Sequence, residues 1–514
     1  MFRASRVVVI GAGINGLVAA NYLRRAGCAV SLIEHASRVG GACVSAAAEV
    51  DGQHQDYALG ASVLGLMQDF VWQDTGLAQR LRSFCPEHPK LVHFPGQAEP
   101  TWIYREPERL DREFADKWGE RGDLRAFRAD EARVVDFLQG GYRAAVTPTL
   151  AAAREALGDE LTRLWITGSA RDLLAHYCSA EGTRTYMAMT VTESGPVSLD
   201  EPGSAFTIPM MDSGSVFGGY YGFVRGGIWQ VTEELGRIND ELGVETFVDS
   251  HVDALDTRAG ELRFTSPRGE QRLAWDQLVL ATDPVTAARL VGDVRLQAHT
   301  QGQRLLGSAG KLNLLFREPV RWKHGTTHPH SDSVFRFRFA VDTIADFEAA
   351  TLRVTEPGAD YAPGYLQIYC EGAAMRQMGL VEPFDRLAVF FKNLALRLPG
   401  DALPEIEAQV RTSVLELVAN PEACCWSRLL TPRDLQQTFG FPGGNLDHTM
   451  LVGGQTFHER GYAADPARGF YRFGGFDNIH VCGAATYPCG SVAGTPGYMC
   501  AQQLLRGIGI EASA

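Results

Sequence analysis

The sequence lacks several features that would place it in a familiar class of protein. It contains no run of roughly eighteen apolar residues, the length needed to cross a bilayer, and no internal repeat or low-complexity segment. Its 10 cysteines are scattered without a C-x-x-C pair, so neither a zinc site nor a redox dithiol is predicted. Basic residues are also too few: the net charge of −13 disfavours a nucleic-acid partner and a generally basic membrane-binding face.

The composition is that of an ordinary globular chain. The 514 residues are 45% hydrophobic and 21% charged, which suits roughly two or three domains with sizeable cores. Two arginines followed by an apolar stretch near the start resemble a secretory signal, but no small-residue cleavage site follows. A nucleotide-binding motif explains the same residues better, and we therefore expect a cytoplasmic protein.

That motif lies between Arg6 and His35. A charge-free β-branched run, typical of a buried parallel strand, leads into G-x-G-x-x-G, a helical pattern and a second strand that ends in an acid. These parts are Val7–Ile10, the glycines Gly11, Gly13 and Gly16, Leu17–Arg25, Ala29–Ile33 and Glu34.

Each part of the motif has a physical role in dinucleotide binding. Gly11 allows a tight turn, Gly13 lets a pyrophosphate approach the backbone, and Gly16 lets helix and strand pack closely. The helix N-terminus presents free N–H groups to the phosphates. Glu34 stands where a carboxylate accepts hydrogen bonds from ribose hydroxyls, which favours the free diol of FAD or NAD.

Two further segments favour FAD over NAD. Arg38-Val39-Gly40-Gly41 resembles the R-x-G-G segment of FAD enzymes in the glutathione-reductase-like class, although Ala42 stands where many relatives have Arg. Asp56–Ser62 resembles the D-x-G-A segment that many FAD oxidases place beside the isoalloxazine ring, with Gly60 and Ala61 allowing close backbone approach. The alternative for this segment is an ordinary surface hairpin that turns at Asp51-Gly52.

The middle of the chain predicts a helical region followed by strands. From Met67 to Met211 helical patterns dominate, among them Asp130–Ala145 and Thr149–Ser169, which indicates an inserted substrate or cap region. A helix over Ile228–Leu242, a strand, a β-meander with a turn at Pro267–Gly269 and a return strand then follow. The predicted strands are Val244–Val248, His251–Asp256, Glu261–Phe264 and Gln271–Leu280. In glutathione-reductase-like folds such a meander crosses over the nucleotide domain, which implies that the backbone of Val252 meets the adenine and that Ala281-Thr282 closes the unit.

Lys311 is a candidate catalytic residue. It leads an alternating strand in the segment Gly307–Phe316. In amine-oxidase-like flavoenzymes a lysine in a similar G-S-x-x-K context holds a water near flavin N5, and such a lysine could relay a proton. The alternative is a solvent-facing lysine on a strand.

Three other features have competing interpretations. His324, His328 and His330 could ligate a metal, but their Pro-, Thr- and Ser-rich setting favours a loop, and no metal site is predicted. Phe384–Leu398 and Pro404–Val418 predict amphipathic helices. The first could lie on a membrane surface, but burial of its apolar stripe in the core is favoured.

The C-terminal third carries two Gly-rich segments. Phe441–His448 has the pattern P-G-G-N-x-x-H. Asn478–Tyr498 contains C-G-A-x-T-x-P-x-G-x-V-x-G-x-P-G-Y and leads into a helix over Met499–Gly507. A strand, a Gly-rich loop and a helix start bring backbone N–H groups to a flavin edge or ribityl chain. His448 is either a proton-transfer group or substrate contact, or a hydrogen-bonded structural histidine; Cys489 is either a flavin tether or, as favoured, a small buried cysteine.

With the N-terminal block, these segments resemble the phytoene-desaturase-like branch of FAD-dependent oxidoreductases, which is related to flavin amine oxidases. The branch includes carotenoid desaturases, retinol saturase and the pyridine nucleotide-disulfide oxidoreductase domain-containing proteins, and the C-terminal segments are most similar to those last proteins. The resemblance implies an α/β fold: a glutathione-reductase-like FAD-binding Rossmann domain with a β-meander, plus a mixed α+β substrate domain. We predict the first from residues 1–66, 222–285 and 470–514, and the second from 67–221 and 286–469.

The predicted site combines many cofactor contacts with two catalytic candidates, Lys311 and His448. The predicted FAD-binding residues are Gly11, Gly13, Ile14, Asn15, Gly16, Glu34, His35, Arg38, Gly40, Gly41, Ala42, Gly60, Ala61, Ser62, Val252, Ala281, Thr282, Gly483, Ala484, Gly490, Ser491 and Val492.

The predicted reaction is that of an FAD-dependent desaturase, dehydrogenase or oxidase. A substrate C–H bond would give a hydride to flavin N5 and leave C=C or C=N. With one complete nucleotide fingerprint, oxygen or a quinone is the expected acceptor. The family favours an apolar isoprenoid or lipid substrate, whereas the context of Lys311 and the acidic composition favour a smaller amine or amino-acid-derived metabolite. A flavin-dependent isomerase and a flavin-binding interaction protein without turnover stay open.

Overall fold

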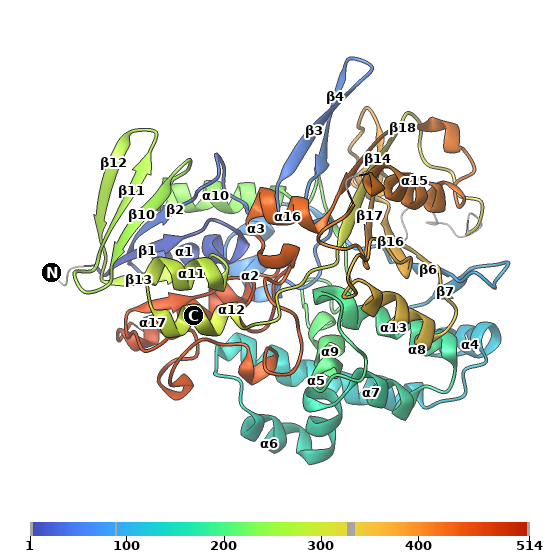
Figure 1. Ribbon diagram of the computed structural model, residues 1–514, viewed down its shortest axis with the longest axis horizontal. Helices are drawn as coiled ribbons and strands as arrows, with labels where there is room; N and C mark the ends of the chain where they lie inside the picture. Colours follow the sequence, from blue (N-terminus) through green and yellow to red (C-terminus); the bar gives the residue numbers. More distant parts are fainter. Residues whose placement is uncertain (1–3, 88–89, 326–334, 400, 511–514) are drawn as a thin grey trace.

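The computed structural model describes residues 4–87, 90–325, 335–399 and 401–510. Two sheets organise the molecule, and Figure 1 shows them in different halves, with both chain termini in the half that contains β1 and β13. Within the described ranges, no helix has both the length and the apolar character that a bilayer crossing requires.

The first sheet is parallel and five-stranded, as the βαβ motif predicts. Its strands come from all three segments that the sequence assigned to the FAD-binding domain. In order across the sheet they are β19 (Ile479–Val481), β13 (Gln277–Leu280), β1 (Arg6–Ile10), β2 (Ala29–Ile33) and β9 (Glu245–Phe247).

Alternate residues of β1 pack on opposite faces of this sheet, as strand geometry requires. Val7 and Val9 join the core beneath α1, α10 and α17, whereas Val8 and Ile10 face a second cluster that contains Phe264 of the meander. The helices of this half are α1 (Ile14–Arg25), α2 (Asp69–Asp74), α3 (Leu77–Arg80), α10 (Gln230–Leu242), α11 (Pro284–Val291), α12 (Val294–Gln301) and α17 (Thr495–Gly507).

The meander is confirmed, but one predicted strand is wrong. It consists of β10 (His251–Asp256), β11 (Glu261–Ser266) and β12 (Gly269–Ala274), paired antiparallel. The single return strand predicted over Gln271–Leu280 is two strands, because the chain leaves the meander after β12, passes Trp275-Asp276 and enters the parallel sheet as β13.

The second sheet is mixed and seven-stranded. Strand β14, the second from one edge, is buried along its whole length, because β17 and β18 flank it and α15 (Ala402–Leu415) covers Leu312 and Leu314. In order the strands are β18 (Cys424–Leu430), β14 (Gly310–Phe316), β17 (Asp385–Phe391), β16 (Tyr365–Tyr369), β15 (Arg336–Phe339), β6 (Lys90–His93) and β7 (Thr101–Ile103).

The helix predicted over Phe384–Leu398 is wrong, and the membrane-surface alternative falls with it. This segment contains β17, which lies between β14 and β16. The charged residues of β17 are buried and paired instead of facing solvent: Arg386 contacts Glu371 at 3.3 Å and Glu382 at 3.1 Å. Arg397, beyond the strand, is exposed. The helix predicted over Pro404–Val418 is confirmed as α15.

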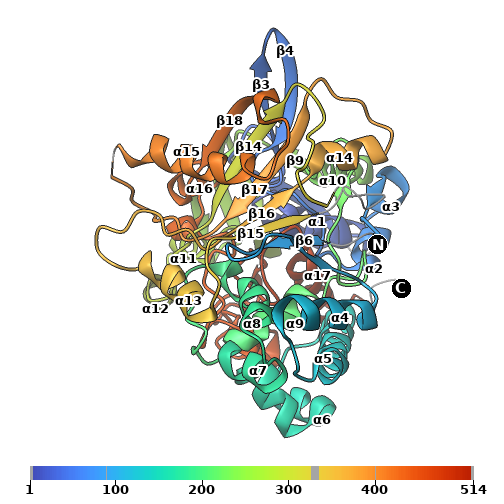
Figure 2. The same ribbon diagram turned by 90° about the vertical axis from the view of Figure 1, so that its right-hand side faces the viewer.

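The predicted helical region is confirmed, and its helices lie beneath the seven-stranded sheet in the view of Figure 2. The longest of them, α5, and the pair α6–η1 contain the helices predicted from residues 130 and 149 onward. The elements of this region are α4 (Pro107–Trp118), α5 (Leu124–Ala144), α6 (Leu150–Leu161), η1 (Thr162–Thr167), α7 (Ala170–Tyr177), α8 (Glu181–Ala188), η2 (Met189–Ser194), η3 (Ser204–Phe206) and α9 (Thr207–Met211).

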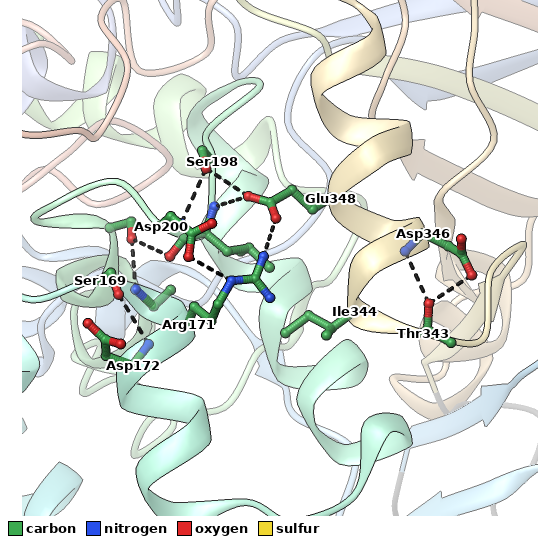
Figure 3. A network of polar contacts seen from close by, with 12 residues as sticks. Ser169, Arg171, Asp172, Ser198, Asp200, Thr343, Ile344, Asp346 and Glu348 are labelled. Atoms are coloured by element: carbon green, nitrogen blue, oxygen red, sulfur yellow. Dashed lines mark hydrogen bonds and ion pairs between the residues drawn. The ribbon is translucent and has the colours of Figure 1, made fainter.

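A polar junction fastens the helical region to α13 (Ile344–Arg353) beside the sheet (Figure 3). Arg171 of α7 pairs with Glu348 of α13 and donates to Asp200 at 2.6 Å. Glu348 in turn accepts from the Ser198 hydroxyl at 2.7 Å and from the Leu199 N–H at 2.8 Å. Glu348 is largely buried, with 13% of its side chain exposed, whereas Asp200 is 64% exposed. The bonds to Glu348 therefore join α7 and the Ser198-Leu199 segment to α13.

Further short strands and helices lie outside the two main sheets and the helical region. Asp51-Gly52 forms the predicted turn, between the strands of a hairpin that projects from the molecule in Figure 1. These elements are β3 (Ser45–Val50), β4 (Gln53–Ala58), β5 (Ser83–Phe84), β8 (Phe223–Val224), α14 (Glu371–Gln377) and α16 (Pro432–Phe439).

Candidate active site

A cavity of about 940 Å³ is lined by residues of both sheets. Its nucleotide end is formed by the turns at the carboxyl ends of β1, β2 and β13, where open parallel sheets bind ligands. Its other end, called the sheet end here, is formed by Glu193 and Asp212 of the helical region and by Phe337, Gln367 and Tyr369 of the seven-stranded sheet.

The first Gly-rich turn presents backbone to the cavity. Gly11 has φ +101°, a conformation that favours glycine. A Cβ on Gly13 would meet no protein atom nearer than 4.0 Å, so the space over its backbone is open, as close approach of a phosphate requires. Gly16 lies outside the wall, and a Cβ there would stand 1.9 Å from the carbonyl oxygen of Gly11, so its role is close packing of α1.

The carboxylate of Glu34 is fixed at the end of β2. It accepts hydrogen bonds from the N–H groups of Ala12 at 2.7 Å and Ala36 at 2.8 Å. It also lines the cavity together with His35 and Val252. The carboxylate keeps lone pairs free for further donors, as a ribose-binding acid requires.

A second turn crosses the first. Gly40 and Gly41 have positive φ, and a Cβ on Gly41 would lie 3.1 Å from the Cα of Gly13. The Ala61 N–H donates to the Ala42 carbonyl at 3.0 Å, which joins this turn to Gly60–Ser62 on the same wall. Arg38 points elsewhere: its guanidinium donates to the backbone carbonyl of Ser45, and it does not line the cavity.

The cofactor-binding residues predicted at Ala281-Thr282 and in the C-terminal segment fall into two groups. Some line the cavity, and others lie behind its wall. Ala281, Thr282, Ala484, Ser491 and Val492 line the cavity. Two glycines lie behind them: a Cβ on Gly483 would stand 2.1 Å from the carbonyl oxygen of Thr282, and Gly490 donates its N–H to Asp447 at 2.8 Å.

Lys311 does not face the cavity. Its ammonium donates to the carbonyl oxygens of Ala58 at 2.6 Å and Ala61 at 3.1 Å, and only 4% of the residue is exposed. Burial lowers the pKa of Lys311 to about 8, although Glu371 nearby opposes the shift. Neither the solvent-facing lysine nor the alternating strand of the sequence interpretation is observed; Lys311 holds the Gly60–Ser62 turn from behind.

His448 does line the cavity. It has φ +62°, its ring lies 4.8 Å from that of Phe441, and its buried Nδ1 has no hydrogen-bond partner among the described residues. Burial lowers the pKa of His448 to about 4, although the carboxylate of Asp283 opposes the shift. The imidazole is therefore neutral at physiological pH and available to exchange a hydrogen bond with a bound molecule.

The sequence analysis missed the polar groups of the sheet end. Glu193 accepts from the Gln367 amide at 2.6 Å and pairs with the buried Lys392 at 3.3 Å. The hydroxyl of Tyr369 donates to the side-chain amide oxygen of Gln367. The signal in the sequence that could have found them is Lys392, a charged residue directly after two phenylalanines in Phe390–Leu394. The sequence analysis interprets that segment as part of a helix.

Two predictions from the sequence are still to be compared with the structure: the role of Cys489 and the cluster of three histidines. Cys489 is buried and lies outside the cavity wall, and burial raises the pKa of its thiol, which favours the small buried cysteine. His328 and His330 lie outside the described residues. Within those that are described, no group of three or more His, Cys, Asp or Glu residues could hold a metal ion.

The cavity fits a dinucleotide such as FAD. Its volume lies in the range of cofactor and ligand pockets. Two polar atoms on its wall, Asn15 Oδ1 and Ser62 Oγ, are buried without a partner among the described residues. Buried polar atoms normally have partners, so these atoms point to a polar ligand.

Comparison with known proteins agrees with this geometry. Residues 9–71 match the model of the NAD(P)-binding Rossmann-like domain family. Over nearly full length, the structure is similar to putrescine oxidase bound to putrescine (16% identity, TM-score 0.57, covering 98% of this chain and 99% of that one). It is also similar to cyclohexylamine oxidase from Brevibacterium oxydans (14% identity, TM-score 0.55, covering 98% and 97%). The chain has the fold of the FAD-dependent amine oxidases. The α/β fold class predicted from the sequence is thereby confirmed.

Two curated proteins match along almost the whole chain. An uncharacterized protein of Mycobacterium tuberculosis is 26% identical over 552 residues, covering 97% of this chain and 96% of its own. The pyridine nucleotide-disulfide oxidoreductase domain-containing protein 2 of Rattus norvegicus is 21% identical over 574 residues, covering 97% and 93%. The last is of the kind that the C-terminal segments resemble; the phytoene-desaturase-like branch itself stays a prediction.

Proposed function

We propose that this chain is an FAD-dependent oxidoreductase that acts on a small molecule bound at the sheet end of the cavity. One observation carries the proposal: a single cavity joins a complete dinucleotide-binding turn to a wall of aromatic and polar side chains on the second sheet. A cofactor that spans these two ends would meet a substrate inside the protein. The amine oxidases that share the fold support this assignment.

The chain's own residues would hold the cofactor from end to end. Glu34 and Val252 would contact the adenosine, the N–H groups at Gly13–Asn15 the pyrophosphate, and the Gly60–Ser62 turn the flavin ring. We also propose the division into a cofactor-binding domain (1–66, 222–285, 470–514) and a substrate domain (67–221, 286–469), because the first sheet draws on exactly the former three segments.

When bound, FAD would accept a hydride from a substrate C–H bond, and the substrate would be left with a C=C or C=N bond. The protein's part is to orient the substrate, exclude water and move a proton. His448 is suited to proton transfer, because its neutral ring lines the cavity and its buried Nδ1 has no partner among the described residues. Lys311 acts as a positioning residue that holds the flavin-side turn through Ala58 and Ala61. We propose oxygen or a quinone as the electron acceptor, since the sequence has one complete dinucleotide fingerprint.

The test is the visible spectrum of the purified protein, followed by anaerobic addition of candidate substrates. We expect a two-banded flavin spectrum that is released as FAD by acid and is bleached by the substrate. A colourless protein that FAD cannot reconstitute would refute the proposal. Saturable binding of NADPH would refute only the proposed acceptor.

A further inference from the structure

Glu193 occupies a distinctive place at the sheet end. It belongs to η2, which ends just before Gly195, and its side chain faces β16 and the end of β17. About 15% of that side chain is exposed, and it lines the cavity. A carboxylate on a cavity wall, supported from behind, has the form of a ligand-binding group.

Three donors hold this carboxylate in one orientation. Oε1 accepts from the Gln367 amide at 2.6 Å and from the Tyr365 hydroxyl at 3.5 Å, and Oε2 lies 3.3 Å from Lys392 Nζ. Tyr369 donates to the side-chain amide oxygen of Gln367, which fixes the amide so that its nitrogen points at Glu193. A carboxylate has about four acceptor positions, so Glu193 can accept one more hydrogen bond from the cavity.

The charge of Glu193 is balanced from behind by Lys392, whose ammonium nitrogen lies 3.3 Å from Oε2. Lys392 is buried, and its burial lowers the pKa of its ammonium, although Glu193 opposes the shift. Lys392 also donates to the backbone carbonyl of Glu193 at 2.5 Å and stands 4.3 Å from the ring of Phe390, so the protein fixes it on its own side of the wall. The cavity side of the carboxylate is therefore left for a donor of a bound molecule.

The surroundings favour a cation with an apolar body. Tyr221, Phe335, Phe337 and Tyr369 line the same end of the cavity. Aromatic faces attract cations as well as apolar groups. Asp212 and Lys90 line this end too, with Lys90 Nζ 5.6 Å from the centre of the Phe337 ring, so the charges of these two residues offset each other. A hydrocarbon chain would cover Glu193 and provide it with no partner.

We propose that Glu193 binds a protonated nitrogen of the substrate, so that the substrate is a small amine with an apolar body and not an isoprenoid. This inference rests on the proposed function, because it assigns the substrate class of the same cavity. Glu193 is a substrate-binding residue in this proposal; Gln367 and Lys392 act through it and are positioning residues.

The test compares two probes of equal size on the FAD-bound protein. Benzylamine is protonated at neutral pH and benzyl alcohol is neutral, and each is titrated anaerobically while the shift of the visible flavin bands is recorded. We expect the wild type to bind benzylamine at least about 10-fold more tightly than benzyl alcohol, as a charge-assisted hydrogen bond implies. Equal or tighter binding of the alcohol would overturn the proposal without any variant.

Two variants then locate the contact. Glu193→Gln should weaken benzylamine binding about 10- to 100-fold and leave benzyl alcohol within about twofold. Asp212→Asn is the matched control, because it removes the other carboxylate of the same end, and it should weaken benzylamine by less than about threefold. Loss of amine affinity in Asp212→Asn but not in Glu193→Gln would overturn the assignment to Glu193. Circular dichroism and flavin content confirm that each variant is folded; where Glu193→Gln is not, the wild-type comparison decides.

The outcomes separate this inference from the proposed function. A protein that binds FAD but prefers the alcohol contradicts the amine substrate alone. A protein that binds no FAD contradicts the proposed function. In that case, binding of both probes is followed by the shift in melting temperature, and a larger shift with benzylamine that disappears in Glu193→Gln still supports the amine site.

Discussion

The two ends of the cavity are built by different means. At the nucleotide end, backbone groups face the cavity from turns that contain Gly11, Gly13 and Gly41. At the sheet end, side chains such as Glu193 and Gln367 do so. Turns are local, so the residues within each turn of the first end follow one another in sequence. The second end depends on contacts such as Lys392 with Glu193, which are separated by 199 residues. A site built from backbone groups tolerates changes in the neighbouring side chains, but it does not tolerate added volume at its glycines. A site built from side chains depends on the identity of each of those side chains.

The sharpest test of the backbone end is Gly16→Val. A Cβ at this position would lie 1.9 Å from the Gly11 carbonyl oxygen, so we expect a loss of about 3 kcal/mol or more in the free energy of unfolding and no retained flavin. Urea denaturation and flavin absorbance measure both effects. Gly140→Ala in α5, where a Cβ meets nothing within 4 Å, is the control and should stabilise by about 0.5–1 kcal/mol. A stable, yellow Gly16→Val protein would contradict this account of the turn.

Lys311→Met tests the contact that joins the two ends. The folded pKa of about 8 lies below the ordinary 10.5. Between these values the folded lysine is neutral while the unfolded one is protonated, so folding releases a proton and stability rises with pH. Below pH 8 both forms are protonated and this dependence vanishes. We expect the wild type to gain about 3 kcal/mol relative to Lys311→Met from pH 8 to 10.5.

The measurement is denaturant unfolding of both proteins at several pH values. Lys323→Met, which changes an exposed lysine, should leave the free energy of unfolding within about 0.5 kcal/mol of wild type. Parallel pH curves for wild type and Lys311→Met would show that Lys311 is not buried as described.

Glu34→Ala removes a carboxylate that the backbone end places against the proposed ribose. We expect the dissociation constant for FAD to rise about 10- to 100-fold, the effect of losing charge-assisted hydrogen bonds. Quenching of FAD fluorescence on titration with apoprotein measures it. Glu318→Ala, at an exposed position, should stay within about twofold, and an unchanged constant in Glu34→Ala would remove Glu34 from the site.

The smallest effect is expected for Cys489→Ala. The sulfur is buried outside the cavity wall, so acid should release the same fraction of FAD from this variant as from the wild type, with a stability change of about 1 kcal/mol. Flavin that stays with the wild-type precipitate and leaves the variant's would instead identify a covalent bond at Cys489.

The comparison also explains which parts could be predicted from the sequence. Gly11–Glu34 and the meander strands β10 and β11 follow local patterns, and the structure has them where the sequence indicates. The segment Phe384–Leu398 does not, because Arg386 and Lys392 among apolar residues have the pattern of an amphipathic helix. Their partners, Glu371, Glu382 and Glu193, become neighbours only when β17 enters the middle of the sheet.

Lys311 shows the same limit at a single residue. Its motif context indicated a group beside the flavin, yet its acceptors are carbonyls of Ala58 and Ala61, about 250 residues earlier in the chain. Sequence identifies a lysine that is unusual for its strand; it does not identify which side of that strand faces the cavity.

The order of strands in the first sheet has a consequence for protein synthesis. β1 begins at Arg6, its neighbour β13 at Gln277, and the edge strand β19 at Ile479, and the ring of Tyr498 in α17 packs 4.9 Å from that of Tyr22 in α1. At ribosomal rates of about 5–20 residues per second, the first strand emerges roughly 25–95 s before the last. The nascent chain must keep its exposed β1 and its incomplete cofactor pocket from aggregating during that interval. Under the proposed function, occupancy by FAD would therefore report that translation has passed β19 and α17, and chains that stop short of β19 should lack the cofactor.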